Sequence, residues 1–226
     1  MSAAAGTALS TGVKTRNYMV GMAPDTTDVQ SISADFMRSG RAVGIVTSVA
    51  GDDATPAAFY AHAPERGMKQ KISGYAPTSG VSFFGAPVFK GMTDADGQPS
   101  SWLADMRNAG YTVVHTFGEY LNTARGSERV LMLAEKAAGE QLGYTLDSIP
   151  GALTLQELTE TALDALQTDP DGFFLMVEGG NIDWAAHAND GASVIKEVIN
   201  FQNAIDVAYR FYQSHPDETL IVITAD

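Results

Sequence analysis

The stretch EGGNIDWAAHAND, residues 178–190, gathers side chains that could bind a metal ion. Glu178 ends the apolar run FFLMVE, and Asp183 and His187 follow it, four residues apart. If a helix begins near residue 182, Asp183 and His187 share one face, because positions i and i+4 are neighbours on a helix. A carboxylate oxygen and an imidazole nitrogen are ligands that zinc accepts. The alternative is an ordinary capped helix with a solvated Asp–His pair, and the spacing leaves both interpretations open.

A serine at the start of an alanine-rich segment is a second candidate. Ser2 opens the stretch SAAAGTALSTGVKT, whose alanines favour a helix. At a helix N-terminus the unpaired N–H groups and the dipole favour negative charge. They would help Ser2 form an alkoxide and would hold an anion beside it. The alternative is a plain N-cap serine.

The third candidate stretch is GDDATPAAFYAHAPERG, residues 51–67. Asp53 and Thr55 follow an apolar run, and Arg66 lies eleven residues beyond Thr55. That separation is about three helical turns, from which Arg66 could bend back as a bidentate phosphate clamp. The alternative makes Asp53 or Thr55 a helix cap and Arg66 a solvated cation at a helix end.

The elements that position these residues form an alternating pattern. Five apolar runs predict strands: AVGIVTS (42–48), VSFFGA (81–86), YTVVH (111–115), FFLMVE (173–178) and TLIVITA (219–225). Apolar on both faces, they are typical of central strands in a parallel sheet. Helical patterns cover 100–110, 153–167 and 191–216. We therefore predict an α/β fold with a mostly parallel central sheet flanked by helices, and we expect Ser2, Asp53, Glu178 and Asp183 near its carboxyl edge.

Two of the predicted helices carry further signals. Thr154 and Glu157 have the spacing of a capping box at the start of one. In the other, Pro216 ends the helix. Its apolar residues that fall roughly on one face predict its buried side: Ile195, Val198, Ile199, Ala204, Ile205 and Ala208.

Residues 67–101 are rich in Gly, Ser, Pro and Asp and predict a loop-rich surface excursion. Within them TDADGQ is interpreted as a solvated turn, because the other ligands of a calcium loop are missing. No linker divides the chain, so residues 1–226 are predicted to form one domain.

The balance of charge limits the partners. The net charge is −13, from 27 acidic and 14 basic residues. Such a field repels phosphate backbones, which argues against nucleic-acid binding, and a phosphate substrate would need metal ions or an arginine. Cysteine is absent, so disulfides and thiolate chemistry are excluded. The apolar runs are far shorter than the roughly 20 residues that span a bilayer, and no signal peptide is visible.

Taken together, the stretches resemble the alkaline phosphatase family. The motifs SAAAGTALSTGVKT, DDATPAAFYAHAPERG, GYTVV, FFLMVEGGNIDWAAHAND and LIVITAD occur in family order over nearly the whole chain. The resemblance implies hydrolysis of phosphomonoesters through a phosphoserine, with two zinc ions and one magnesium ion. It also implies a periplasmic or secreted location, and phosphomonoesters and inorganic phosphate as ligands.

The resemblance assigns the main roles as follows. Ser2 matches the nucleophile, and Arg66 matches the arginine that binds two phosphate oxygens. Asp183 and His187 match ligands of the first zinc, and Asp226 matches a ligand of the second.

The remaining assignments concern the third metal site and the phosphate. Thr55 and Glu178 match ligands of the magnesium site, and Asp53 matches a neighbouring position that tunes it. Trp184 stands where some members carry a lysine or histidine near the phosphate. Its indole N–H can donate a hydrogen bond but brings no charge.

The sequence also departs from the family pattern. Met1 stands where the family has an Asp, the preceding strand with its Asp-Gly is absent, TADH is shortened to TAD, and a later histidine is missing. We therefore expect incomplete metal sites, an incomplete core, exposed strand edges and self-association into a homo-oligomer. The isolated chain is expected to be weakly active or inactive. The alternatives are a catalytically silent fragment that binds metal or phosphate, and a phosphodiesterase or phosphomutase of the same superfamily.

Overall fold

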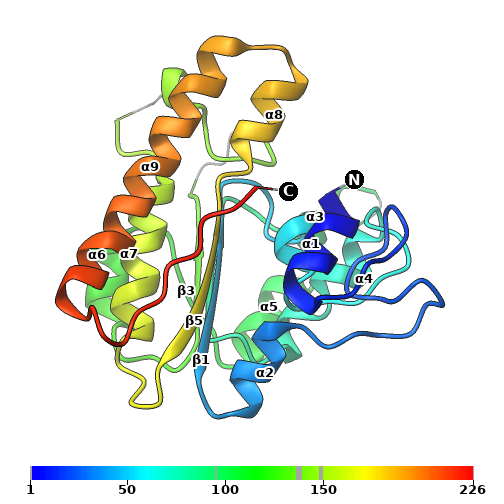
Figure 1. The fold of residues 1–226 in the computed structure, drawn as a ribbon, viewed down its shortest axis with the longest axis horizontal. Coiled ribbons are helices and arrows are strands. Elements are labelled where there is room, and N and C mark those ends of the chain that lie inside the picture. The colour runs from blue at the N-terminus through cyan, green and yellow to red at the C-terminus, as the bar shows by residue number, and fades with distance from the viewer. Residues whose placement is uncertain (1, 95, 136–138, 148–149, 226) are drawn as a thin grey trace.

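The computed structural model describes residues 2–94, 96–135, 139–147 and 150–225, which form a central sheet with helices on both faces (Figure 1). Five strands in these residues are all parallel and follow the order β3-β4-β2-β1-β5. Their bounds are β1 Ala42–Thr47, β2 Phe83–Ala86, β3 Thr112–Val114, β4 Val130–Leu133 and β5 Phe173–Glu178. The prediction of an α/β fold with a parallel sheet is confirmed.

Helices cover the two faces unequally. On one face lie α1 (Ser2–Thr11), α2 (Ile32–Arg38), α3 (Ala54–Ala57), α4 (Lys69–Ser73) and α5 (Trp102–Asn108). The other face carries α6 (Phe117–Glu119), α7 (Leu155–Leu166) and α9 (Gly191–Ser214), while α8 (Asn181–His187) lies beyond the end of β5. Shorter turns are η1 (Ala76–Thr78), η2 (Lys90–Met92), η3 (Tyr120–Ala124) and η4 (Thr145–Asp147). No helix in the described ranges is long and apolar enough to cross a membrane.

The core consists of two apolar clusters, one on each face of the sheet. Successive residues of a strand point to opposite faces, so Ile45 joins the cluster beneath α1–α5 and Val46 joins the cluster beneath α7 and α9. Gly44 lets α7 lie directly on β1, because a Cβ there would come within 2.6 Å of the Leu166 side chain. The strands that lead to the predicted site are thus held rigidly from both sides.

The predicted strand at 219–225 is wrong. This segment is an extended trace that forms no ladder with any described strand (red in Figure 1), and Leu220, Val222 and Ile223 are exposed by 86%, 74% and 62%. An apolar pattern becomes a strand only where a neighbouring strand accepts its hydrogen bonds. Among the described residues β5 pairs with β1 alone, so β5 lies at the edge of the sheet rather than in the predicted central place.

Strand β4 was not predicted from the sequence. Its four residues, VLML, are fully buried between β2 and β3. A run of that length is too short for its periodicity to separate a strand from a helical turn.

The helical predictions are confirmed in extent and partly wrong in orientation. Helix α7 begins with the predicted capping box, in which Thr154 and Glu157 bond reciprocally. Helix α9 ends at Ser214, before Pro216, but its residues Ile195, Val198 and Ile199 are exposed by 64%, 49% and 50%. Ala204 is buried as predicted, but the other buried residues of the helix are Ser193, Glu197 and Val207.

Buried Glu197 explains why the other face of α9 turns inward. Its Oε1 accepts hydrogen bonds from the Thr145 backbone N–H at 2.7 Å and from the Thr145 hydroxyl at 2.8 Å, and its Oε2 accepts one from Asn200. These bonds orient the helix and leave the apolar stripe outside.

Residues 67–101 are more ordered than predicted. Helix α4 lies among them and buries Ile72 and Ser73. The predicted solvated turn is present, since the Asp94 side chain accepts hydrogen bonds from the exposed Asp96 and Gln98 backbone N–H groups.

Candidate active site

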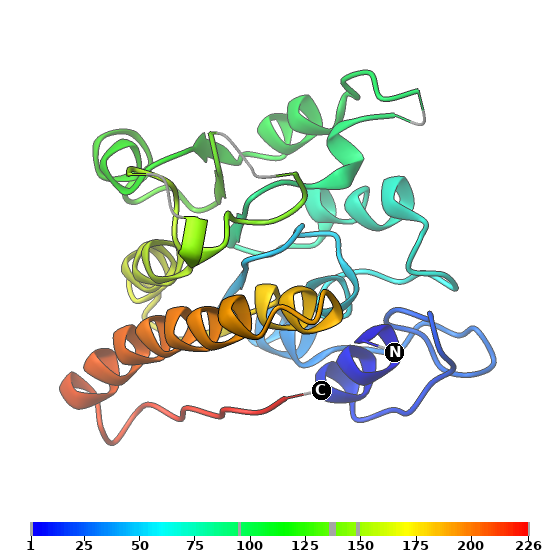
Figure 2. The same ribbon diagram turned by 90° about the horizontal axis from the view of Figure 1, so that it is seen from above.

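Several of the residues predicted for the site follow β1 and β5, which end side by side. Thr47 and Glu178 are paired in register at the carboxyl ends of these strands, and the Thr47 hydroxyl donates a 2.5 Å hydrogen bond to Glu178 Oε2. Figure 2, which views the molecule from this end, shows α1 and α8 both lying here. The predicted carboxyl edge is therefore the place where these segments meet.

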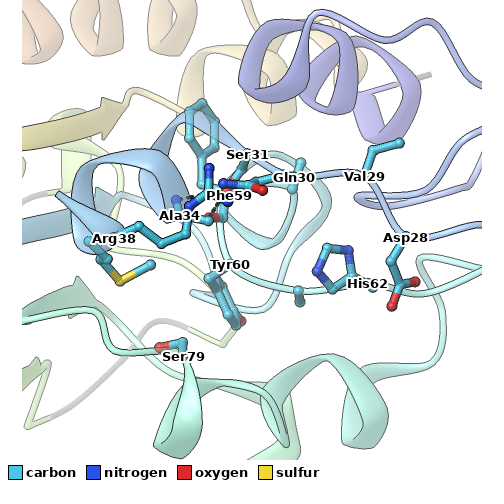
Figure 3. A pocket seen from close by; sticks show the side chains of 13 residues that line it. Asp28, Val29, Gln30, Ser31, Ala34, Arg38, Phe59, Tyr60, His62 and Ser79 are labelled. Carbon is cyan, nitrogen blue, oxygen red and sulfur yellow. Dashed lines mark hydrogen bonds between the residues drawn. The ribbon is translucent and has the colours of Figure 1, made fainter.

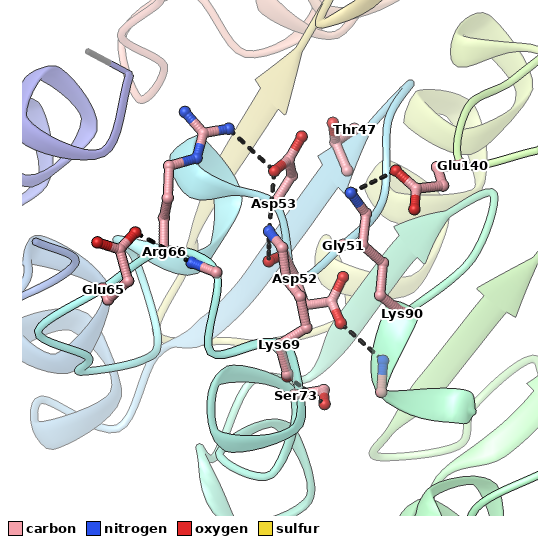
Figure 4. Close-up of polar contacts among 12 residues, drawn as sticks. Thr47, Gly51, Asp52, Asp53, Glu65, Arg66, Lys69, Ser73, Lys90 and Glu140 are labelled. Atoms are coloured by element: carbon pink, nitrogen blue, oxygen red, sulfur yellow. Dashed lines mark hydrogen bonds and ion pairs between the residues drawn. The ribbon is translucent and has the colours of Figure 1, made fainter. Parts of the chain in front are cut away.

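Asp53 is the centre of a charged cluster after β1 (Figure 4). Its Oδ1 accepts hydrogen bonds from Arg66 Nη2 at 3.1 Å and from Lys69 Nζ at 3.0 Å. It occupies the N-cap position of α3, yet its side chain makes no capping bond. Burial alone would raise the pKa of Asp53, but Lys69, Lys90 and Arg66 outweigh it and lower that pKa, so the carboxylate is ionised.

The adjacent Asp52 behaves in the opposite way. It is fully buried, its Oδ2 accepts a 2.9 Å hydrogen bond from the Gly91 backbone N–H, and its Oδ1 has no hydrogen-bond partner among the described residues. Burial raises the pKa of Asp52, and the backbone and lysine contacts offset that only in part. Two neighbouring aspartates thus differ because cations bond to the side chain of one alone.

Arg66 reaches the site by a route that the sequence did not predict. Helix α3 ends at Ala57, so the predicted three helical turns from Thr55 are wrong. The following segment forms an isolated bridge between Val20 and Ala63, and the Arg66 backbone N–H donates to Tyr18 O at 2.8 Å. This loop, rather than a long helix, returns the guanidinium to Asp53.

The packing of α1 on α3 fixes the position of the helix that begins with Ser2. Gly6 allows close approach, because a Cβ there would lie 3.2 Å from the Thr55 Cα. One turn further on, the Ser10 hydroxyl donates a 2.8 Å hydrogen bond to Ala58 O. Ser2 is the half-buried first residue of α1, as predicted, and Thr55 is half-buried in α3.

The segment after β5 presents Asp183 and His187 to solvent. Helix α8 begins at Asn181, so the two side chains share a face, with His187 Nε2 and Asp183 Oδ1 3.3 Å apart. Their side chains are 80% and 57% exposed, respectively. Asp226, the further predicted ligand, lies outside the described residues.

Hydrogen bonds join the loop after β1 to the start of α8. The Asn181 backbone N–H donates to Ser48 Oγ at 3.1 Å, and Asn181 Nδ2 donates to Leu142 O at 2.9 Å. Gly180 fits closely, because a Cβ there would come within 2.8 Å of the Val49 side chain. The loop after β1 therefore fixes the position at which α8 begins.

Comparison with known proteins gives the family. The alkaline phosphatase family model matches residues 1–96 and 100–226. This chain belongs to the alkaline phosphatase family. Alkaline phosphatase 4 of Bacillus subtilis is 33% identical over 228 residues, covering all of this chain and 48% of that protein. The alkaline phosphatase of Escherichia coli is 28% identical over 272 residues, covering all of this chain and 57% of that protein.

Solved structures of alkaline phosphatases are similar as well. The enzyme from the Antarctic bacterium TAB5 superposes with a TM-score of 0.84 and 30% identity, covering 95% of this chain and 61% of that one. A mutant of the TAB5 enzyme, with a TM-score of 0.86 at 30% identity over 95% of this chain and 60% of its own, is described with magnesium bound in its M3 site. This chain spans about half the length of the curated relatives it matches.

Trp184 has a cation beside it that the sequence did not reveal. The Lys90 ammonium lies 6.0 Å from the centre of the indole ring and forms an ion pair with Glu140. A lysine from η2 thus lies against a tryptophan from α8. Neither Lys90 nor Lys69 belongs to a recognisable motif, so only the fold could identify them.

The described residues fit the family's metal ions only in part. The Asp183–His187 pair has the donor types of a zinc site, and Glu178 has the oxygen donors that magnesium prefers. Within the described ranges, however, no group of three or more His, Asp or Glu side chains is placed to hold one ion. The described residues therefore supply Asp183 and His187 as a pair rather than as part of a complete ligand set.

A cavity of about 400 Å³ lies apart from these residues, beside α2 (Figure 3). Two of its polar side chains bond to backbone carbonyls: His62 Nδ1 contacts Gly21 O at 2.6 Å, and the Ser31 hydroxyl donates to Phe59 O at 2.9 Å. None of the predicted site residues lines it. It is therefore not a second candidate active site.

Proposed function

We propose that the carboxyl edge of β1 and β5 is a phosphomonoesterase site, with Ser2 as nucleophile and Arg66 as the phosphate-binding cation. The observation that carries the proposal is the return of the Arg66 guanidinium to Asp53, 3.1 Å away, at the end of β1. Family membership supports the reaction, since the matching proteins are named alkaline phosphatases. A guanidinium suits phosphate because it can donate two parallel hydrogen bonds.

Ser2 performs the covalent step in this proposal. Its Oγ bonds to phosphorus and loses its proton, while the ester P–O bond breaks and the leaving alcohol takes up a proton. Water then attacks the phosphoserine, so inorganic phosphate leaves and Ser2 regains its hydroxyl proton. The start of α1 favours this chemistry because its unpaired N–H groups and dipole stabilise negative charge.

Divalent ions belong to the proposal by family resemblance. Asp183 and His187 would hold one zinc and Asp226 a second, and Thr55 and Glu178 would hold magnesium. When bound, such ions act as Lewis acids and lower the pKa of coordinated water. The chain's own contribution is to orient the pair on α8, where the facing His187 and Asp183 atoms are 3.3 Å apart.

Asp53 and Trp184 position the phosphate in this scheme. Asp53 holds Arg66 and Lys69 through one oxygen, and by the family resemblance it would tune the magnesium site. Trp184 would donate its indole N–H to a phosphate oxygen. The neighbouring Lys90 adds positive charge.

The isolated chain should hydrolyse phosphomonoesters slowly. Catalytic zinc sites use about three protein ligands, whereas the described residues offer Asp183 and His187 as a pair. The same observation favours a second candidate function, a catalytically silent domain that binds phosphate or metal.

By the same resemblance we propose a periplasmic or secreted, self-associating protein. The exposed stripe of Ile195, Val198 and Ile199 on α9 supports self-association, because large apolar patches on a surface mark interfaces. Sedimentation equilibrium over a range of concentrations would measure it, and a monomer throughout would contradict it.

The test of function measures hydrolysis of 4-nitrophenyl phosphate with zinc and magnesium present. We expect slow turnover that Ser2→Ala abolishes and Ser39→Ala, at an exposed serine, leaves unchanged. Acid-quenched protein should carry a phosphoryl group on Ser2, detected by mass spectrometry. Equal turnover in Ser2→Ala would rule out the proposed nucleophile. Faster cleavage of bis(4-nitrophenyl) phosphate would indicate a diesterase, and phosphate binding without turnover would favour the silent domain.

A further inference from the structure

Lys69 lies beneath the proposed phosphate-binding arginine and has no role in the scheme above (Figure 4). It is the first residue of α4, and its side chain is only 16% exposed. Its Nζ donates one hydrogen bond to Asp53 Oδ1 and a second to the Asp52 backbone O, both at 3.0 Å. Two of its three donors are therefore directed into the loop after β1.

Helix α4 holds Lys69 in a fixed place. The Ser73 hydroxyl donates to Lys69 O at 2.7 Å, and the buried Trp102 indole N–H donates to Ser73 O at 2.7 Å. Gly91 lets η2 pack closely against Ser73, because a Cβ at position 91 would fall on the Ser73 side chain. Helix α4, which carries the Lys69 side chain, is thus anchored to buried residues of the core.

Arg66 and Lys69 share one carboxylate oxygen unequally. Both donate to Asp53 Oδ1, but the Arg66 side chain is 29% exposed while that of Lys69 is 16% exposed. The guanidinium has five N–H donors, of which Nη2 bonds to Asp53. Arg66 is therefore the outer cation with donors to spare, and Lys69 is the inner one.

The pairing of Arg66 and Lys69 with the single carboxylate of Asp53 sets the net charge of these three side chains. Two cations on one carboxylate leave the three side chains with one net positive charge, in a chain whose net charge is −13. Without Lys69, Asp53 and Arg66 would neutralise each other, and both carboxylate oxygens would be open to the guanidinium in the strong bidentate geometry. The arginine would then offer less attraction and fewer donors to an anion.

We propose that Lys69 is a positioning residue that binds the Asp53 carboxylate and so keeps the Arg66 guanidinium available for a phosphate anion. This inference rests on the proposed role of Arg66 in binding phosphate. It assigns Lys69 no contact with the phosphate itself.

The experiment measures the affinity for inorganic phosphate by isothermal titration calorimetry in five proteins. These are the unaltered chain, Lys69→Met, Lys69→Arg, Arg66→Ala and Lys71→Met. Lys71 is the matched control, because it is an exposed lysine on the same helix and its replacement changes the net charge equally. A thermal melt of each protein reports folding separately.

We expect Lys69→Met to weaken phosphate binding about tenfold, as the loss of one close charge would. Lys69→Arg should restore most of the affinity because it keeps the cation, and Lys71→Met should stay within about twofold of the unaltered chain. NMR of the Arg66 Nε–H gives a second readout: its signal should move on adding phosphate to the unaltered chain, and in Lys69→Met the same movement should need about tenfold more phosphate.

Four results would overturn one of the two proposals, and they can be told apart. Phosphate affinity in Lys69→Met equal to that in Lys71→Met would overturn the role of Lys69. Loss of affinity in Lys69→Arg as large as in Lys69→Met, with a lowered melting temperature in both, would make Lys69 merely structural. Unchanged affinity in Arg66→Ala, or no phosphate binding by the unaltered chain, would overturn the proposed function itself.

Discussion

Strands β1 and β5 are hydrogen-bonded neighbours, yet the segments that follow them are built in opposite ways. After β1, Asp52 and Asp53 are 0% and 7% exposed, and Asp53 is paired with two cations. After β5, the Asp183 and His187 side chains are 57% and 80% exposed and contact each other. One half of the site is buried and bonded, and the other is open to water.

The difference shows which side chains are held in a fixed position by the folded chain itself. A buried carboxylate must be paired, since leaving it uncompensated is strongly unfavourable, so Arg66 and Lys69 are held in place whenever the chain is folded. An exposed Asp–His pair gains little, because water screens it. The half that we propose to bind phosphate is therefore preorganised, while the half that we propose to bind metal ions presents an exposed Asp–His pair.

The largest effect should come from removing the shared carboxylate. Asp53→Asn would leave Arg66 and Lys69 close together and uncompensated, and should lower the free energy of unfolding by about 3 kcal/mol. Asp183→Asn, the matched change in the open half, should alter it by less than about 0.5 kcal/mol. Urea denaturation of the two variants measures both, and equal losses would contradict the contrast between the halves.

An intermediate effect should come from the contact between Gly180 and Val49, where the loop after β1 meets the segment before α8. Gly180→Ala places a methyl group 2.8 Å from the Val49 side chain, and such overpacking should lower the free energy of unfolding by about 2 kcal/mol. Gly191→Ala is the control, because a Cβ there meets nothing within 4 Å. Equal unfolding free energies for both variants would show that the halves are less tightly fitted than described.

The smallest effect should be a stabilisation by zinc that depends on the open half. At a free zinc concentration of about ten times the dissociation constant, binding adds about 1.4 kcal/mol to the free energy of unfolding. His187→Ala should abolish this gain, while His215→Ala, at another exposed histidine, should keep it. Thermal melts with zinc and then with a chelator measure the gain, and a gain that persists in His187→Ala would place the zinc elsewhere.

The sequence was sufficient where a signal is local. The apolar runs of β1 and β5 were predicted together with the residues that follow them, and the Thr154–Glu157 capping box formed as its spacing indicated. The start of α8 near Ile182 was predicted as well, and with it the shared face of Asp183 and His187. Each of these depends on residues within one element or one turn.

What the sequence could not predict depends on partners distant along the chain. Lys69 meets Asp53 because α4 is anchored by Trp102, and Arg66 returns through a loop pinned at Val20 and Tyr18. The run 219–225 has the pattern of a strand but no neighbour that pairs with it among the described residues.

The buried face of α9 was predicted only in part, for a similar reason. The helix carries apolar residues on more than one face. The hydrogen bond between Glu197 and Thr145 determines which face is buried. Periodicity alone contains no information about that choice.

The pairing of β1 with β5 also has a consequence for the order of folding. Thr47 and Glu178 are 131 residues apart in sequence, whereas β3 and β4 pair Thr112 with Val130. Closing a longer loop loses more chain entropy before any contact compensates for it, so distant strand pairs form slowly. We expect β5 to dock after the other strands have paired. On the folding pathway the charged cluster around Asp53 would then exist before α8 arrives, and Asp183 and His187 would join it only at the last step.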